Sequence, residues 1–330
     1  MRQGAITSAI LFNVYMDRLI KKLRRAGLGC YIAGMFSGVF IYADDILLLC
    51  PSRPGLQAMV SICETFAKNN NMKFSTNPDP IKSKTKCIIF SQKQSDRNGV
   101  LEIVLNNNNL PWVPDLKYLG TILESDSSMR KDMSTKRGKF IGKINSLRQE
   151  FYFASPEVKI KLYNIYTISF YGSMLYNLYS PECQRIYTAW NQIIRQCFQV
   201  HRQTHRYLIE ELSECLHPKV LMASRLVKFH SNLLKCDKSL VKLLANLTQN
   251  DCRTVHGLNL MKISKECNAE PSSLNTFTVK STMKYFKVPL EETWRLQILK
   301  ELLSVKFGET VLDNFEEHEM NDMIDMLCLS

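Results

Sequence analysis

The most constraining feature of the sequence is a pair of adjacent carboxylates, Asp44 and Asp45, inside an otherwise apolar run from residue 39 to residue 50. A run of this composition is typical of a buried strand, where an unpaired charge costs several kcal/mol. The two carboxylates are therefore not expected in the middle of a single strand. We predict two short strands, Val39–Tyr42 and Ile46–Cys50, joined by a tight turn at residues 43–45 that exposes both carboxylates.

Adjacent carboxylates at an exposed turn present hard oxygen ligands of the kind that Mg²⁺ (or Mn²⁺) takes together with substrate phosphates. Two such ions can activate a hydroxyl nucleophile and stabilise a leaving pyrophosphate. An Asp-Asp pair is also common in turns that do no more than reverse the chain. The apolar strands on both sides of Asp44 and Asp45 favour the metal interpretation.

The surrounding segments alternate between helical and strand patterns. Helical spacing of apolar residues predicts a helix over residues 8–26, ended by Gly27, and a second helix over residues 55–69. The last turns of the first helix are basic, which suits either a solvated face or a phosphate-contacting face. The apolar runs 30–35 and 39–50 predict a hairpin. Further strands are expected at residues 87–90, 101–105, 110–113 and 118–123.

Short motifs flank the carboxylate pair in a definite order. They are Arg2-Gln3-Gly4 with Ser8 and Leu11-Phe12-Asn13, then Ser83-Lys84-Thr85-Lys86, then Tyr118-Leu119-Gly120. Over residues 2–123 this order and spacing resembles the reverse transcriptases of non-long-terminal-repeat (non-LTR, LINE-type) retrotransposons. In that family these segments are motif B, motif D and the primer grip, and Tyr-Ala-Asp-Asp is the catalytic motif C. Ala9 is a mild departure, because many family members have proline there.

The resemblance implies a role for each matching position. Asp44 and Asp45 would be the catalytic residues and would bind the metal ions. The residues implied to contact the template base and the incoming deoxynucleotide are Arg2, Gln3, Gly4, Tyr42, Ala43 and Lys84. The primer grip would be formed by Tyr118, Leu119 and Gly120. The implied partners are an RNA template, a DNA primer and a dNTP. A simpler interpretation stays open for Tyr42, Tyr118 and Leu119 as packing residues and for Lys84 as a solvated edge residue.

One part of the family's site is expected to be missing. Motif A carries the other metal-binding aspartate and precedes motif B in the family, whereas motif B begins here at Arg2. We therefore expect an amino-terminally truncated fragment of an RNA-directed DNA polymerase, with Mg²⁺ or Mn²⁺ bound only in the complete enzyme. Such a fragment would be inactive alone. Asp17 lies on the helix after motif B and is not expected to replace the missing aspartate.

Strand signals stop after about residue 126, and helical periodicity continues from there. We predict an α+β chain with a partial palm (an antiparallel sheet with packed helices) over residues 1–126. An all-α, basic thumb would follow over residues 127–235, and a helical region with an acidic end over residues 236–330. The formal net charge is +12, although the segment Glu309–Asp325 carries seven acidic residues and no Lys or Arg. A basic body with an acidic end suits a polyanion partner.

Two basic segments stand out in the helical part. Residues 128–165 carry nine basic and three acidic residues, interleaved with tyrosines 152, 163 and 166 that we expect mainly in the core. By resemblance this segment would be the thumb, which tracks the template–primer minor groove. The stretch Arg185–Arg206 has four arginines and no acid. There His201 and His205 have the i, i+4 spacing of helical metal ligands but no third ligand, so a basic helix facing nucleic acid is favoured.

The cysteines and the apolar pattern indicate the cellular environment of the protein. The eleven cysteines are an odd number and include no Cys-x-x-Cys pair, which predicts reduced thiols rather than disulfides or a zinc knuckle. The absence of a signal-peptide pattern and of long apolar runs predicts a soluble, intracellular protein with no membrane partner. Oligomeric state is not indicated. Two rival hypotheses remain, a non-enzymatic nucleic-acid-binding remnant of a retroelement and a decayed element that folds poorly.

Overall fold

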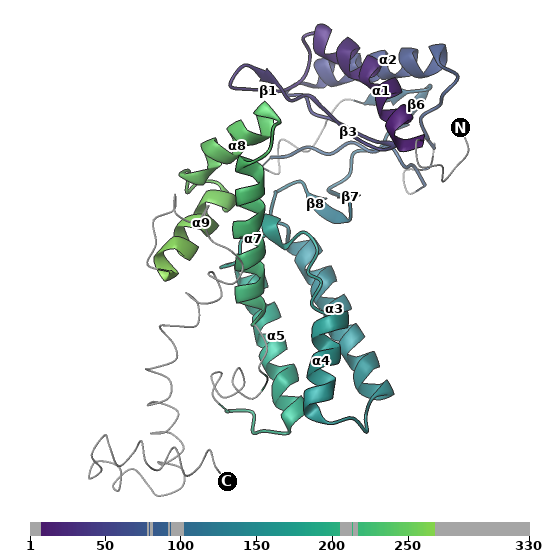
Figure 1. The fold of residues 1–330 in the computed structure, drawn as a ribbon. Helices are drawn as coiled ribbons and strands as arrows, with labels where there is room; N and C mark the ends of the chain where they lie inside the picture. The colour runs from purple at the N-terminus through teal and green to yellow at the C-terminus, as the bar shows by residue number, and fades with distance from the viewer. Residues whose placement is uncertain are drawn as a thin grey trace, which may run out of the picture. The chain divides into compact units, whose positions relative to one another are not determined.

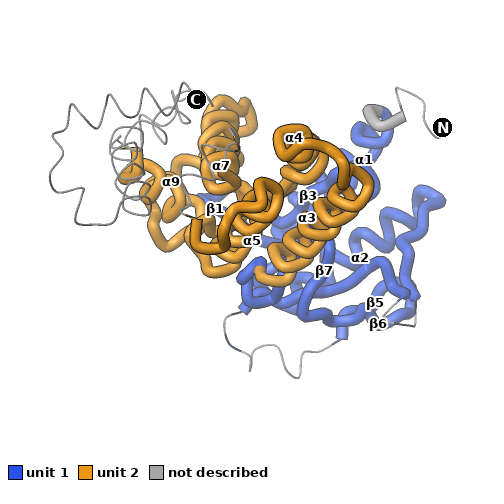
Figure 2. The backbone as a smooth tube through the Cα atoms, turned by 90° about the horizontal axis from the view of Figure 1, so that it is seen from below, with its two compact units in different colours: residues 1–129 blue, residues 130–330 orange. Residues whose placement is uncertain are grey.

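The computed structural model describes residues 8–77, 79, 82–91, 93, 102–204, 213 and 217–267. The chain forms two compact units, residues 1–129 (unit 1) and residues 130–330 (unit 2), drawn in different colours in Figure 2. Each unit is described by itself. Among the described residues no helix is long and apolar enough to cross a membrane.

In its described residues, unit 1 consists of two helices and four short antiparallel hairpins (Figure 1). Its helices are α1 (Ser8–Arg25) and α2 (Arg53–Asn69). Its strands are β1 (Tyr31–Ile32), β2 (Met35–Phe36), β3 (Val39–Tyr42), β4 (Asp45–Leu48), β5 (Ile103–Leu105), β6 (Asn108–Leu110), β7 (Asp115–Tyr118) and β8 (Thr121–Glu124). Each hairpin pairs two consecutive strands.

The start of α2 and the end of α1 lie at residues that the sequence marks as helix ends. Ser52 caps α2, its hydroxyl oxygen accepting from the backbone N–H of Gly55 at 3.3 Å, and Pro54 occupies the first turn, where its missing N–H costs nothing. After α1, Gly27 adopts the left-handed region at φ 67°. The two predicted helices are confirmed, with α2 starting two residues earlier than expected.

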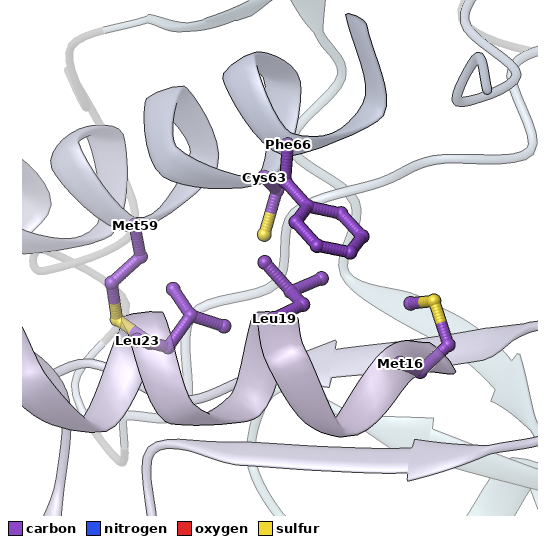
Figure 3. Close-up of a cluster of buried hydrophobic side chains, with 6 residues drawn as sticks. All are labelled: Met16, Leu19, Leu23, Met59, Cys63 and Phe66. Atoms are coloured by element: carbon purple, nitrogen blue, oxygen red, sulfur yellow. The ribbon is translucent and has the colours of Figure 1, made fainter. Parts of the chain in front are cut away.

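The core of unit 1 lies between its two helices. Figure 3 shows Met59, Cys63 and Phe66 of α2 pointing toward side chains of α1. The partners from α1 are Met16, Leu19 and Leu23. One face of the β3–β4 hairpin packs against the same cluster through Val39, Ile41, Ile46 and Leu48. A second cluster, formed by Val60, Cys87, Ile103, Leu105 and Leu110, joins α2 to the β5–β6 hairpin.

All four hairpins have two-residue turns, which need left-handed backbone. In three of them both turn residues have positive φ, namely Ala33-Gly34, Asn106-Asn107 and Leu119-Gly120. The fourth turn, which joins β3 to β4, consists of Ala43 and Asp44. Of these two residues only Ala43, with a φ of 51°, has the left-handed backbone. The right-handed twist of paired strands matches such turns, so hairpins this short close without a longer loop.

The structure corrects three strand predictions. Residues 87–90 form no named strand, because only Cys87 pairs, in an isolated parallel bridge with Trp112. The strand expected at 118–123 is instead a hairpin, because Leu119 and Gly120 turn the chain between β7 and β8. The strand expected at 110–113 is β6, which ends at Leu110 because the turn closes at Asn106 and Asn107.

The runs 30–35 and 39–50 also pair less than expected. Residues 31–36 fold back on themselves as β1 and β2, while β3 pairs with β4. The two runs are joined by the Cys30 N–H, which donates to the Leu49 carbonyl at 3.0 Å. At this crossing a Cβ on Gly29 would lie 3.0 Å from the Gly38 Cα atom, and the φ of Gly29 is 106°. Glycine is needed there for close backbone approach.

Unit 2 is helical throughout its described residues. Its elements are α3 (Arg130–Glu150), α4 (Pro156–Tyr166), the short 3₁₀ turn η2 (Ser173–Leu175), α5 (Pro181–Phe198), α7 (Pro218–Leu234), α8 (Ser239–Gln249) and α9 (Val255–Glu266). Its core is built around large, fully buried side chains that include Tyr163, Tyr176 and Trp190. With the hairpins of unit 1, this arrangement confirms the predicted α+β class.

Candidate active site

The predicted carboxylate turn lies at the tip of the β3–β4 hairpin. Tyr42 pairs with Asp45, so Ala43 and Asp44 form the turn itself, and Asp45 opens β4 rather than lying within the turn as expected. Both carboxylate residues are exposed, and Tyr42 is 66% exposed. Because the inner face of the hairpin is held in the helix core, the exposed tip is anchored to a packed support. The expected exposure of both carboxylates is confirmed.

The outward face of the same hairpin is unusually apolar for a surface. Phe40 is 40% exposed, and it shares this face with Leu47 across the ladder and with Tyr42 nearer the tip. Alternation explains the pattern, because residues 39 and 41 point into the core and residues 40 and 42 point out. An apolar surface next to two carboxylates is suited to hold a ligand with both apolar and charged parts.

The turn of the β7–β8 hairpin is electrostatically coupled to the carboxylate turn. Tyr118 closes the β7–β8 turn opposite Thr121 and is half-buried. Burial raises the pKa of the Tyr118 hydroxyl, and the negative charge of Asp45 raises this pKa further. Tyr118 thus stays a neutral hydrogen-bond donor beside Asp45. Leu119 and Gly120, which follow it at the turn, are exposed.

Lys84 is also among the sequence-predicted positions that the structure describes. The side chain of Lys84 is exposed and lies in a bend between Ser83 and Thr85. The bend is fixed by the Ser83 hydroxyl, which donates to the Thr85 carbonyl at 2.7 Å, and by the Thr85 hydroxyl, which donates to the Ser75 carbonyl at 2.8 Å. Within the described residues, no hydrogen bond or ion pair joins Lys84 to Asp44 or Asp45. Arg2, Gln3 and Gly4 lie outside the described residues.

The ligand chemistry of the turn suits a hard divalent cation. Asp44 and Asp45 offer carboxylate oxygens, and Mg²⁺ is commonly held by one or two carboxylates together with substrate phosphates. Within the described ranges no cluster of three or more His, Cys, Asp or Glu residues could hold a metal ion by itself. The turn therefore fits a cation that takes its remaining ligands from a substrate or from other carboxylates.

The long helix α3 presents an exposed basic face that contains two glycines. Gly138 and Gly142 lie in the helix interior, and a Cβ built on either would meet no atom within 4 Å. Helix-interior glycine costs about 1 kcal/mol relative to alanine, and no close packing among the described residues compensates for this cost. The exposed basic residues of the helix include Lys131, Lys139, Lys143 and Arg148. The sequence analysis missed both glycines, although their i, i+4 spacing was a readable signal.

The aromatic residues around α3 and α4 divide between core and surface. Tyr163 is buried in the core, as expected, and 1% exposed. Tyr152 and Tyr166 are not in the core, because the α3–α4 connection and the end of α4 leave them 76% and 58% exposed. Lys159 and Lys143 donate to the backbone carbonyls of Tyr152 and Tyr166, at 2.8 and 3.5 Å. These bonds hold basic groups at the backbone of two residues whose rings are exposed.

The arginine-rich stretch that begins at Arg185 is only partly available to a ligand. Arg185 is exposed on α5, whereas the guanidinium of Arg195 donates twice to the Thr204 carbonyl, at 3.0 and 2.8 Å. Arg195 therefore fastens the loop after α5. His201 accepts from the Gln203 N–H through Nδ1 at 3.2 Å, and His205 lies outside the described residues.

Comparison with known proteins agrees with this geometry. Residues 1–123 match the family model described as reverse transcriptase (RNA-dependent DNA polymerase). The chain is 31% identical over 134 residues to a Retrovirus-related Pol polyprotein from type-1 retrotransposable element R2 of Nasonia vitripennis, covering 38% of this chain and 12% of that protein. It is 31% identical over 125 residues to a Retrovirus-related Pol polyprotein from type-2 retrotransposable element R2DM of Drosophila melanogaster, covering 36% of this chain and 11% of that protein.

The chain thus spans about an eighth of the length of these relatives. The family match ends inside β8, after both the carboxylate turn and the Tyr118–Gly120 turn. The matched segment therefore includes the two exposed aspartates and Tyr118, whose pKa is raised in part by Asp45. Residues 1–123 are therefore similar to reverse transcriptases, and the two relatives named above are Pol polyproteins of R2 retrotransposable elements.

Proposed function

We propose that this chain contributes the catalytic turn, the primer grip and the thumb of an RNA-directed DNA polymerase that adds deoxynucleotides to a primer 3′ end. The observation that carries the proposal is the exposed Asp44–Asp45 tip with Tyr118 of the next functional turn in its electrostatic field. Two carboxylates and a neutral hydroxyl donor at one location suit a site that binds a metal-complexed phosphate and the end of a nucleic acid strand.

Asp44 and Asp45 would hold Mg²⁺ or Mn²⁺ through their carboxylate oxygens. When bound, the metal would lower the pKa of the primer 3′-hydroxyl and stabilise the leaving pyrophosphate. Tyr42 and Ala43 would support the primer terminus from the exposed face of the hairpin. The left-handed backbone at Ala43, with a φ of 51°, closes the turn that carries Asp44.

Further roles follow for the remaining matched positions. Tyr118, Leu119 and Gly120 would position the primer backbone, with Tyr118 donating its hydroxyl hydrogen bond. Lys84, exposed and free of a described ion pair, would reach the nucleotide phosphates. Arg2, Gln3 and Gly4 would contact the template base and the incoming nucleotide.

The thumb assignment rests on α3. Its exposed face combines lysines with Gly138 and Gly142, so a nucleic acid backbone could approach the helix closely while basic side chains neutralise its phosphates. A duplex of the RNA template and the DNA primer is the partner that this face would track.

We further propose that residues 1–330 alone do not extend primers. The described residues bring no third carboxylate to the Asp44–Asp45 turn, and nucleotidyl transfer with two metal ions needs carboxylates that bridge both. The rival hypothesis, a nucleic-acid-binding module without catalysis, draws on the basic face of α3. The two hypotheses differ in one outcome. Only the polymerase hypothesis predicts nucleotidyl transfer at the Asp44–Asp45 turn once a further metal-binding carboxylate is supplied.

A segment exchange tests this difference. In the Nasonia vitripennis relative, the segment aligned with residues 1–123 is replaced by those residues, and primer extension on an RNA template is compared with that of the unmodified relative. We expect extension by the chimera and its loss in the Asp44→Ala and Asp45→Ala variants. Extension that survives both substitutions would refute the catalytic role of the turn. Robust extension by residues 1–330 alone would refute their proposed inactivity.

A further inference from the structure

The two helices of unit 1 enclose an open groove on their outer surface. It has a volume of about 440 Å³ and is lined by Lys22 and Arg25 of α1 and by Ser61, Ile62 and Thr65 of α2. Figure 3 shows the packed side of the same helix pair, where Leu19 and Leu23 of α1 enter the core. None of the described residues that line the groove belongs to the β3–β4 hairpin, so the groove is distinct from the carboxylate turn.

Among the described residues that line the groove there is no acidic side chain. Across α1 and α2 the acidic residues are Asp17 and Glu64, and each is held by a lysine on its own helix, Lys21 and Lys68, at 2.6 Å. These pairs leave Lys22 and Arg25 without an ion-pair partner in the part of the chain that the structure describes. The groove therefore has an uncompensated positive charge.

The lysine of the groove is held in place. The Lys22 ammonium lies 5.6 Å from the centroid of the Phe66 ring of α2, within cation–π distance, so its side chain leans toward α2. On the α2 side of the groove, Ser61 and Thr65 are small and uncharged. Their hydroxyls donate to backbone carbonyls one turn earlier, at 3.0 and 2.8 Å. The wall leaves room for a ligand next to the two cations.

The positive charge extends along α1 beyond the groove. Arg18, Lys22 and Arg25 are spaced i, i+4 and i+7, so they lie on one face of the helix, and all three are exposed. At 1.5 Å per residue this row is about 10 Å long, which is longer than a single phosphate group. A row of this length suits a ligand with repeated negative charges.

We infer that the α1–α2 groove binds the sugar–phosphate backbone of a nucleic acid strand, as a contact separate from the Asp44–Asp45 turn. Lys22 and Arg25 neutralise neighbouring phosphates, and Arg18 extends the contact along the strand. The inference rests on the proposed function only for the class of partner. It also decides between the two interpretations of the basic end of α1, since a groove with uncompensated cations is more than a solvated face.

The test measures binding of a labelled RNA–DNA hybrid to residues 1–330 by fluorescence anisotropy over a series of salt concentrations. The test variant is Lys22→Gln with Arg25→Gln. The matched control is Lys21→Gln with Arg24→Gln, which removes the same charge from the same helix outside the groove. We expect the groove pair to weaken binding about tenfold and to reduce the slope of log affinity against log salt by about 2, with a much smaller change in the control.

Equal losses in the groove pair and the control pair would overturn the inference, because they would show a general charge effect. The conservative pair Lys22→Arg with Arg25→Lys should bind as the unmodified chain does. Ser61→Glu, which places a carboxylate opposite the cations, should weaken binding as the groove pair does. Full affinity in Ser61→Glu would count against the groove. Far-UV circular dichroism and melting temperatures should be unchanged in all variants, since every substituted residue is exposed.

Two further measurements distinguish this inference from the binding of a single phosphate and from the proposed function of the Asp44–Asp45 turn. Inorganic phosphate should displace the hybrid no better than chloride at equal ionic strength, and saturable displacement would point instead to a pocket for a single phosphate. The effect of the groove pair should persist when Asp44→Asn and Asp45→Asn are also present. If the chimera fails to extend primers and the groove pair still weakens binding, the proposed function fails and the groove inference stands.

Discussion

In unit 1 the carboxylates of the predicted site and most basic side chains lie in solvent, whereas unit 2 encloses polar and charged side chains in its core. Asp132 is 1% exposed, and it accepts from Lys136 Nζ at 2.7 Å and from the Tyr176 hydroxyl at 2.5 Å. The Asn259 side chain is also fully buried and bonds the backbone of Tyr176 and Leu178. Asp44 and Asp45, by contrast, are exposed and stabilise no described part of the core.

This difference separates groups that hold the fold from groups that are free to act. A buried charge must be paired, because its desolvation is costly, so the Asp132 network is bound to structure. An exposed carboxylate pair carries no such structural task and is available to a ligand. The functional surfaces of this protein are therefore expected on its exposed charges, and its stability is expected to depend on its enclosed ones.

The largest effect is expected from removing the buried carboxylate of unit 2. Asp132→Ala leaves Lys136 and Tyr176 without this acceptor, and breaking a buried pair costs about 3–5 kcal/mol. Urea unfolding followed by hydrogen exchange of α3 peptides would measure it. Asp17→Ala removes the exposed partner of Lys21 and should cost less than about 1 kcal/mol. Similar losses in the two variants would erase the distinction between enclosed and exposed charge.

A smaller effect is expected from the core of unit 1. Leu19 is fully buried between α1 and α2, so Leu19→Ala should lower the free energy of unfolding of unit 1 by about 3 kcal/mol. Faster hydrogen exchange should be confined to residues of unit 1. Leu11→Ala, on the same helix but 53% exposed, is the matched control and should have little effect. Equal acceleration in unit 2 peptides would show that the two units do not unfold separately.

Two histidines, the buried His230 and the half-buried His256, make the stability of unit 2 depend on pH. The described residues of unit 1 include no histidine. His256 Nε2 lies 2.9 Å from His230 Nδ1, and burial together with His230 lowers the pKa of His256 to about 4. A lowered pKa favours the neutral imidazole in the fold. The stability it contributes is therefore present above the ordinary histidine pKa and is lost as pH falls through the folded value.

The melting temperature of unit 2 should accordingly fall between pH 7 and pH 4, with exchange in α7 and α9 accelerating first. In His256→Gln this part of the pH dependence should flatten. A profile that is unchanged by the substitution would show that another group titrates.

The smallest effect on the stability of unit 2 is expected at the two glycines of α3, where the sign of the effect is the informative result. Gly138→Ala and Gly142→Ala should each stabilise unit 2 by about 1 kcal/mol, because alanine favours helix and open space surrounds both positions. The same variants should bind the RNA–DNA hybrid more weakly if this face contacts it closely. Gly257→Ala should instead destabilise, since its Cβ would lie 2.4 Å from the carbonyl oxygens of Thr248 and Asp251. Unchanged hybrid binding in both α3 variants would remove α3 from the proposed interface.

The sequence predicted those parts of the fold that local chemistry determines. The cap at Ser52, the stop at Gly27 and the charged interruption at Asp44 and Asp45 are each encoded within a few residues, and all appear in the structure. The sequence predicts a strand over residues 118–123, yet the left-handed Leu119 and Gly120 make a turn. A turn without Asn or Asp carries a weak signal in sequence.

Predictions that depend on distant partners were less successful. The residues 87–90 have strand composition, but only Cys87 finds a bridging partner, and no local pattern reveals that. Arg195 is basic in sequence but structural in the fold, because the Thr204 carbonyl happens to lie within its reach. The coupling of Tyr118 to Asp45 joins residues more than seventy positions apart. In the sequence, only the resemblance to a family relates those two turns to each other.

The most direct test of the central claim maps metal-dependent cleavage of a bound primer–template. Fe²⁺ replaces Mg²⁺ and, with ascorbate and peroxide, generates hydroxyl radicals that cut nucleic acid next to the bound ion. If Asp44 and Asp45 hold the metal beside the primer terminus, the chimera that carries residues 1–123 in the Nasonia vitripennis relative should give cuts clustered at the primer 3′ end, and Asp44→Asn with Asp45→Asn should abolish them. Cuts spread along the duplex, or a cluster that survives both substitutions, would contradict the account.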